Sequence, residues 1–97
     1  MRTLLKVVME VTASNAAIKN AKLPEIIKAT VDKLKPEACF FLASEGCRTG
    51  MFVFDLKDPS DIPGIAEPFF MELNAKLEFQ PVMNLEDLKK GLAAIGQ

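Results

Sequence analysis

From Thr3 to Val11 the chain reads Thr-Leu-Leu-Lys-Val-Val-Met-Glu-Val, a run of mainly β-branched and long apolar residues. Successive side chains of a β-strand point to opposite faces of the sheet. On that spacing one face of this segment is apolar and the other is mixed: Leu5, Val7, Met9 and Val11 share the first, and Leu4, Lys6, Val8 and Glu10 share the second. We therefore expect a strand whose apolar face covers the core.

The segment after this strand has the spacing of an amphipathic helix. We expect a short turn over 14–20, capped by Ser14 or Asn15. A longer helix then begins near Pro24, because proline is tolerated in a first turn, and ends before Pro36. The apolar stripe of this helix is Leu23, Ile26, Ile27, Thr30, Val31 and Leu34.

A second amphipathic helix follows the turn and capping residues of 58–64. Pro68 lies inside it, so we expect a kink or a break there. A last helix begins after Asn84, with Asp87 in the capping-box position, and stops at Gly96. The apolar residues of these helices are Ile65, Ala66, Phe69, Phe70 and Leu73 in the first, and Leu85, Leu88, Leu92 and Ile95 in the second.

Three further segments are predicted to be strands. Residues 37–45 contain a short apolar run, and 51–56 alternate. Between them 45–50 hold two glycines, which favours a hairpin connection. Residues 76–83 alternate again, and Pro81 indicates an edge strand because proline has no N–H for a second neighbour.

The predicted order is strand, helix, strand, strand, helix, strand and a final helix. This order is typical of the ferredoxin-like α+β fold, with a four-stranded antiparallel sheet and its helices on one face. Right-handed crossovers place the strands of 3–11 and 51–56 in the centre. We expect a single domain over 1–97, because a chain of this length has no room for two.

Composition excludes several classes of function. The chain has no His, Trp or Tyr, which removes the commonest general base and metal ligand. Twelve basic and 13 acidic residues leave a net charge of −1, so nucleic-acid binding is not expected. No apolar run is long enough for a membrane span, and no export signal is recognised, so we expect a cytoplasmic protein.

Two cysteines, Cys39 and Cys47, have neither a disulfide pattern nor metal-ligand spacing. We expect free thiols, no metal site and no cofactor. Without a histidine to activate it, a reactive Cys47 is the less favoured interpretation, even with Arg48 beside it.

The mixed face of the predicted sheet carries the candidate site. Solvent exposure is its simplest explanation. Alternatively, a second sheet covers it in a homodimer, and its polar residues line a cavity. The candidate ligand-binding residues are Lys6, Glu10, Arg48, Asp55, Glu78 and Gln80, of which Glu10, Asp55 and Glu78 are the candidate proton-handling groups.

The predicted order, the length and the mixed face resemble the dimeric α/β-barrel proteins of the ferredoxin-like class. The chain is also similar to a family of small bacterial proteins whose motifs carry no assigned chemistry. That similarity rests on Glu-Gly-Cys-Arg-Thr-Gly at 45–50 before Phe-Val-Phe-Asp at 52–55, Asp-Pro-Ser-Asp-Ile-Pro at 58–63, and Ala-Glu-Pro-Phe-Phe at 66–70. The resemblance implies a fold and a dimer; haem degradation, also known in the class, is not expected without His and Trp.

The function we expect is a homodimeric module, without demonstrable catalysis, that binds a small apolar or amphipathic molecule between two sheets. The alternative is a cofactor-independent monooxygenase or isomerase in which one of the three carboxylates moves a proton.

Overall fold

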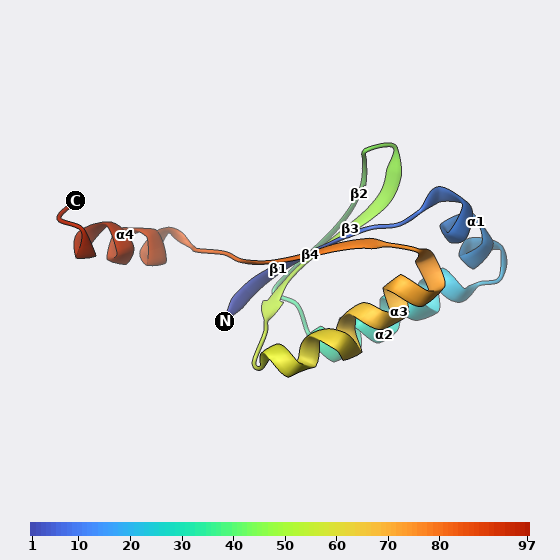
Figure 1. The fold of residues 1–97 in the computed structure, drawn as a ribbon, viewed down its shortest axis with the longest axis horizontal. Coiled ribbons are helices and arrows are strands. Elements are labelled where there is room, and N and C mark those ends of the chain that lie inside the picture. The colour runs from blue at the N-terminus through green and yellow to red at the C-terminus, as the bar shows by residue number, and fades with distance from the viewer.

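The computed structural model describes all residues from Met1 to Gln97. It is an α+β fold with one four-stranded antiparallel sheet (Figure 1). The elements are β1 (Arg2–Val8), α1 (Val11–Lys19), α2 (Lys22–Leu34), β2 (Ala38–Ser44), β3 (Cys47–Asp55), a 3-10 turn (Pro59–Asp61), α3 (Ile62–Leu73), β4 (Lys76–Pro81) and α4 (Leu85–Ala94).

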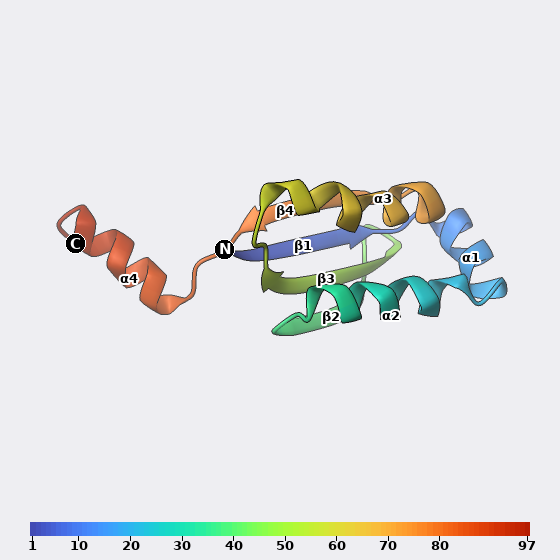
Figure 2. The same ribbon diagram turned by 90° about the horizontal axis from the view of Figure 1, so that it is seen from below.

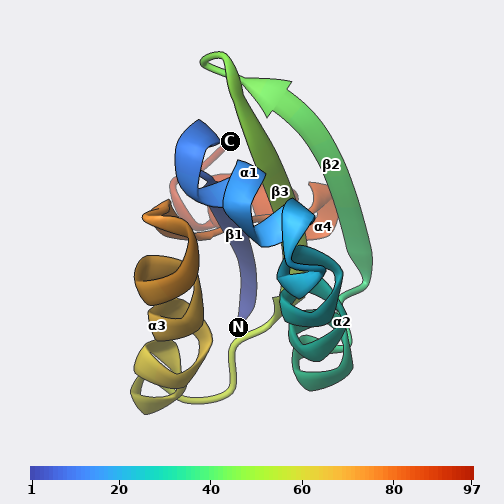
Figure 3. The same cartoon turned by 90° about the vertical axis from the view of Figure 1, so that its right-hand side faces the viewer.

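The strand order in the sheet is β2-β3-β1-β4, which confirms the ferredoxin-like arrangement. β1 and β3 lie in the centre and β4 lies at an edge, as predicted, but β4 ends at Pro81 and not at Met83. Helices α2 and α3 run along one face of the sheet, and α1 caps one end (Figures 2 and 3). No element of the chain covers the opposite face.

The core lies between the sheet and α2 and α3. Its fully buried side chains come mainly from the apolar face of β1, from β3 and from α3: Leu5, Val7, Met9, Phe52, Phe69 and Leu73. The α2 residues Leu23, Ile26, Ile27, Val31 and Leu34 pack against them and stay partly exposed. The predicted stripes of both helices therefore form the second layer of the core, except for Phe70 of α3, which is 44% exposed.

The first strand is shorter than predicted. β1 ends at Val8, and Val11 begins α1 instead of continuing the strand. The Met9 amide donates to the Arg48 carbonyl, but the Glu10 amide donates to the carbonyl of Leu73 in α3, so the chain leaves the sheet there. The Ser14 or Asn15 cap was also wrong, because α1 is already helical at these residues and Glu10 is its N-cap.

The β2–β3 hairpin is tighter than predicted. Glu45 and Gly46 alone form the turn, with φ of 56° and 72°, the backbone of a type I′ turn. The strand then begins at Cys47 rather than Met51. Gly50 therefore lies inside β3. A glycine suits this position because a Cβ there would lie only 3.2 Å from the Phe52 ring and 3.3 Å from the Phe41 ring.

Helix α3 continues through Pro68, where we expected a kink or a break. Proline removes the hydrogen bond to the carbonyl four residues earlier, that of Gly64. Both residues are exposed and line an open groove between α2 and α3, where water can bind that carbonyl.

Helix α4 stands apart from the rest of the fold. The expected capping box is present: the Asp87 amide donates to Asn84 Oδ1 at 2.8 Å, and the Asn84 amide donates to Asp87 Oδ2 at 3.1 Å. No residue of α4 is buried. The helix extends beyond the end of the sheet and lengthens the molecule to 54 Å (Figures 1 and 2).

Candidate functional site

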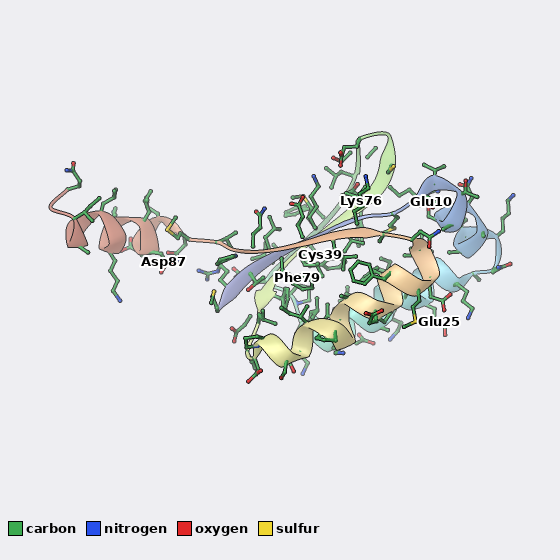
Figure 4. The ribbon with its side chains drawn as sticks, viewed as in Figure 1. Glu10, Glu25, Cys39, Lys76, Phe79 and Asp87 are labelled. Carbon is green, nitrogen blue, oxygen red and sulfur yellow. The ribbon has the colours of Figure 1, made fainter.

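The strand register shows which side chains share the open face of the sheet. Lys6 lies between Met51 on β3 and Glu78 on β4. Leu4 lies between Val53 and Gln80 in the same way. Figure 4 shows the two sides of β4, with Lys76 away from the helices and Phe79 toward them.

The open face divides into two halves of different chemistry. The half formed by β1 and β4, which we call the polar half, carries Lys6, Lys76, Glu78 and Gln80 with Leu4 and Val8 between them. The half formed by β2 and β3, which we call the apolar half, carries Phe40, Leu42, Met51 and Val53.

The apolar half is unusually exposed for its composition. The side chains of Phe40 and Leu42 are 65% and 43% exposed, and Met51 and Val53 are only half-buried. Contiguous apolar surface of this kind marks a contact site more often than plain solvated surface.

Three of the six candidate residues come together on the polar half. Lys6 and Glu78 are direct cross-strand neighbours, whose Cβ atoms lie about 5 Å apart in such pairs. Gln80 Nε2 donates to Glu78 Oε2 at 3.3 Å, so the amide and the carboxylate lie side by side. This group offers one cation, one anion and one amide beside Leu4.

Glu10 lies at the end of the fold that α1 caps, not on the open face. It precedes α1, and its Oε2 accepts a hydrogen bond from Asn74 Nδ2 at 3.0 Å (Figure 4). Asn74 ends α3 in the left-handed conformation. Glu10 therefore ties the start of α1 to the end of α3.

Arg48 is also turned toward the helices. Its Nη1 donates to Ser14 Oγ at 2.7 Å and to Asn15 Oδ1 at 2.8 Å, both on α1. Ser14 is fully buried and donates in turn to the Val11 carbonyl at 3.2 Å. Arg48 thus joins the hairpin to α1, and within one chain it does not reach Lys6 or Glu78.

Asp55 lies at the other end of β3. Its Oδ1 accepts from the α-ammonium of Met1 at 2.6 Å, and this contact lowers the pKa of the Asp55 carboxyl below its ordinary value. Asp55 pairs in register with Arg2, whereas Glu10 lies past the opposite end of β1, roughly 25 Å away at the usual rise per strand residue. The carboxylates of Glu10 and Asp55 are therefore not brought together within one chain.

A cluster of ion pairs at the base of α4 was not predicted. Arg2 Nε lies 2.5 Å from Glu37 Oε1, and Arg2 Nη1 lies 3.7 Å from Asp87 Oδ2. These residues are far apart in the sequence and match no motif. The pairing of β3 with β1 and β2 brings Glu37 to Arg2, and the pairing of β1 with β4 brings Asp87 there.

The helix side holds a groove of about 420 Å³ between α2 and α3, which the sequence also did not indicate. Ile26, Leu34 and Ile65 form part of its lining, and Lys22, Glu25 and Glu72 are among its polar residues. Glu25 is on α2, on the side of the sheet opposite Lys76 (Figure 4). None of the candidate residues lines this groove.

The two cysteines are free and lie at opposite ends of the β2–β3 ladder. Cys39 pairs in register with Phe52 and packs against the core, and burial raises the pKa of its thiol. No group of three or more acidic or cysteine side chains is placed to hold a metal ion. No helix is long and apolar enough to cross a membrane.

No protein-family model, curated protein or solved structure matches this chain. The dimeric α/β-barrel resemblance therefore stays a prediction.

Proposed function

We propose that this protein is a homodimeric binding module, and that two copies turn their open sheet faces toward each other around a small apolar or amphipathic molecule. The observation that carries the proposal is the uncovered face itself. It places an exposed apolar half directly beside the Lys6–Glu78 pair, with no element of the same chain over either.

The charges of the polar half suit partial enclosure. A buried ion is costly unless it is paired and hydrogen-bonded. Lys6 and Glu78 are cross-strand neighbours that make no ion pair in the free chain, and Gln80 already donates to Glu78. Enclosure by a second copy can bring the two neighbouring charges into contact. Lys6 and Glu78 together have no net charge, so a second copy can cover these two without leaving an unbalanced ion, whereas Lys76 is exposed at the start of β4 and can remain in water.

The same arrangement defines the ligand class. Leu4 and Val8 provide apolar contact, and Lys6, Glu78 and Gln80 provide both donors and acceptors. Pockets for small molecules typically combine an apolar lining with a few polar groups that fix orientation. An uncharged amphipathic molecule with one polar end fits this pattern.

Catalysis is not part of the proposal. Of the three candidate proton-handling groups, only Glu78 lies on the polar half, and the monooxygenase or isomerase alternative has no observation in its favour beyond that placement. It stays a prediction, for which Glu78→Gln is the direct test.

The experiment is native mass spectrometry of the purified protein together with light scattering of Leu4→Lys and Glu67→Lys. Leu4 is half-buried at the centre of the open face, whereas Glu67 is exposed on α3. We expect a dimer for the parent and for Glu67→Lys, and a monomer for Leu4→Lys. A monomeric parent at high micromolar concentration would refute the proposal.

The ligand is tested separately with the double variant Lys6→Met and Glu78→Met, which removes both charges together. We expect the parent dimer to carry additional non-covalent mass and the double variant to lose it while remaining a dimer. Additional mass that persists in the double variant would place the molecule elsewhere, with the groove between α2 and α3 as the next site to examine.

A further inference from the structure

Helix α4 has an apolar stripe without a partner in its own chain. Leu85, Leu88, Leu92 and Ile95 recur at three and four residue spacing and are 64%, 42%, 40% and 72% exposed. The helix has 10 residues, and isolated helices of fewer than about 12–15 residues are marginal in water. Packing against another surface is the usual source of stability for such a helix.

The structure holds α4 away from its own sheet. The Val82 amide donates to the Arg2 carbonyl at 3.2 Å, so the connector continues the line of β4. The capping box fixes the first turn, and Asp87 lies 3.7 Å from Arg2. Figures 1 and 2 show the result, in which α4 points outward past the end of the sheet and lies over neither face.

The apolar half of the open face is the matching uncovered surface. Phe40 and Leu42 are its most exposed members. The helix is about 15 Å long at 1.5 Å per residue. The β2–β3 ladder is about 23 Å long at 3.3 Å per residue. The helix therefore fits along this half without extending past its ends.

Charge agrees with this placement. At 100° per residue Lys89 borders the stripe of α4. Glu45, in the hairpin beside the apolar half, makes no ion pair within its own chain, whereas Glu37 and Asp55 at the other end are paired. Lys89 lies 3.8 Å from Glu86 on its own helix, an exposed contact that contributes little, so a helix docked on this half can turn Lys89 toward the Glu45 carboxylate.

We infer that α4 is exchanged between two copies of the chain, so that its stripe packs on the apolar half of the partner. A second copy is the occupant because every chain carries both the free helix and the free surface, so one two-fold axis satisfies both at once. The inference rests on the proposed dimer and deepens it. Exchange closes the apolar half and leaves the two polar halves to enclose the ligand.

The test is disulfide trapping between two different full-length chains, both carrying Cys39→Ala and Cys47→Ser. One chain carries Leu88→Cys in the α4 stripe, and the other carries Phe40→Cys on the apolar half. The control replaces Leu88→Cys by Lys90→Cys, which lies on the opposite side of α4. After mixing and mild oxidation, we expect a covalent heterodimer with Leu88→Cys at a yield at least about tenfold that of the control.

A second variant measures the contribution of the stripe without cysteine chemistry. Leu88→Lys removes one leucine side chain from the proposed contact between the chains. Burial of a leucine typically changes a dissociation constant tenfold or more. We expect dimer dissociation to rise by at least about tenfold, whereas Lys90→Gln leaves it unchanged.

The outcomes separate this inference from the dimer proposal. A stable parent dimer in which Leu88→Cys and Lys90→Cys cross-link Phe40→Cys equally would overturn helix exchange and leave the dimer intact. A single chain that carries both Leu88→Cys and Phe40→Cys, also with Cys39→Ala and Cys47→Ser, tests for contact within one molecule. Rapid cross-linking in this chain as a monomer would overturn both proposals, because α4 would then cover its own sheet.

Discussion

Replacing Arg48 by methionine separates a structural role of this residue from a ligand-binding one. The substitution keeps most of the aliphatic length and removes both hydrogen bonds from Nη1, to Ser14 Oγ and to Asn15 Oδ1. Ser14 is 0% exposed, so its hydroxyl oxygen loses a donor that water does not easily replace.

The magnitude follows from these two contacts. A hydrogen bond from a charged donor contributes about 1.5–3 kcal/mol, and a neutral one about 0.5–1.5 kcal/mol. Asn15 is exposed and Arg48 is half-buried, so the bond to Asn15 is screened and contributes little. We expect Arg48→Met to lower the free energy of unfolding by about 1–2 kcal/mol, mainly through Ser14.

The assay is urea unfolding at one fixed protein concentration, since dissociation of a dimer adds to the measured value. Lys90→Met, which removes an exposed cation without an ion pair, is the control. A double-mutant cycle with Ser14→Ala isolates the pair, and we expect a coupling energy of about 1 kcal/mol. A change within about 0.3 kcal/mol of the control, together with loss of bound mass in the native spectrum, would refute the structural role.

Three more outcomes are expected. Phe52 is fully buried, and its ring centroid lies 5.9 Å from that of Phe41 in an edge-to-face contact. Phe52→Ala should lower the free energy of unfolding in urea by about 3–5 kcal/mol. A decrease below about 1 kcal/mol would contradict the place of Phe52 in the core. Burial raises the pKa of the Cys39 thiol, so its reactive thiolate forms only above the ordinary thiol pKa. In the variant Cys47→Ser, iodoacetamide should therefore label Cys39 slowly at neutral pH and rapidly in urea. Equal labelling rates in the two conditions would contradict the burial of Cys39. The lowered pKa of Asp55 means that its contact with the Met1 ammonium stabilises the fold at pH values above the unfolded-state pKa. This stabilisation is lost as the pH falls through the folded-state pKa, so Asp55→Asn should lose stability at neutral pH but not in strong acid. An equal loss at both pH values would contradict the ion pair.

Much of the fold was predictable because its signals are local. The alternation of Leu5 and Val7 with Leu4 and Lys6 identified both faces of β1, and the helical stripes of α2 and α3 identified the second layer. Pro81 indicated an edge strand without any knowledge of its neighbours. Chain order and crossover handedness then sufficed for the strand order.

Two predictions were wrong at residues that usually mark a turn or the end of a helix, glycine and proline, but that here lie inside a strand and inside a helix. Gly50 was interpreted as part of a turn, but the aromatic rings of Phe41 and Phe52 require a small residue inside β3. Pro68 was expected to kink or break α3, but an exposed carbonyl on the helix surface tolerates the missing donor. Both effects depend on what lies next to the residue in space.

The candidate site was predictable only in part. Lys6, Glu78 and Gln80 share a face because strand alternation alone puts them there once β1 and β4 pair. Glu10 and Arg48 were placed with them on the assumption of a longer β1 and a longer hairpin loop. Since β1 ends at Val8 and β3 begins at Cys47, both side chains contact elements on the helix side instead.

By itself the sequence determined the four strands, the helices α2, α3 and α4, their apolar faces and the fold class, because periodicity and capping act over a few neighbouring residues. Helix α1, where a strand end and a short turn were expected, was not determined in this way. Only the tertiary structure decided the register that pairs Lys6 with Glu78, the contact of Arg48 with Ser14, and the separation of α4 from the sheet. These features depend on contacts between segments distant in the chain, whose packing selects one geometry among several that local patterns allow equally well.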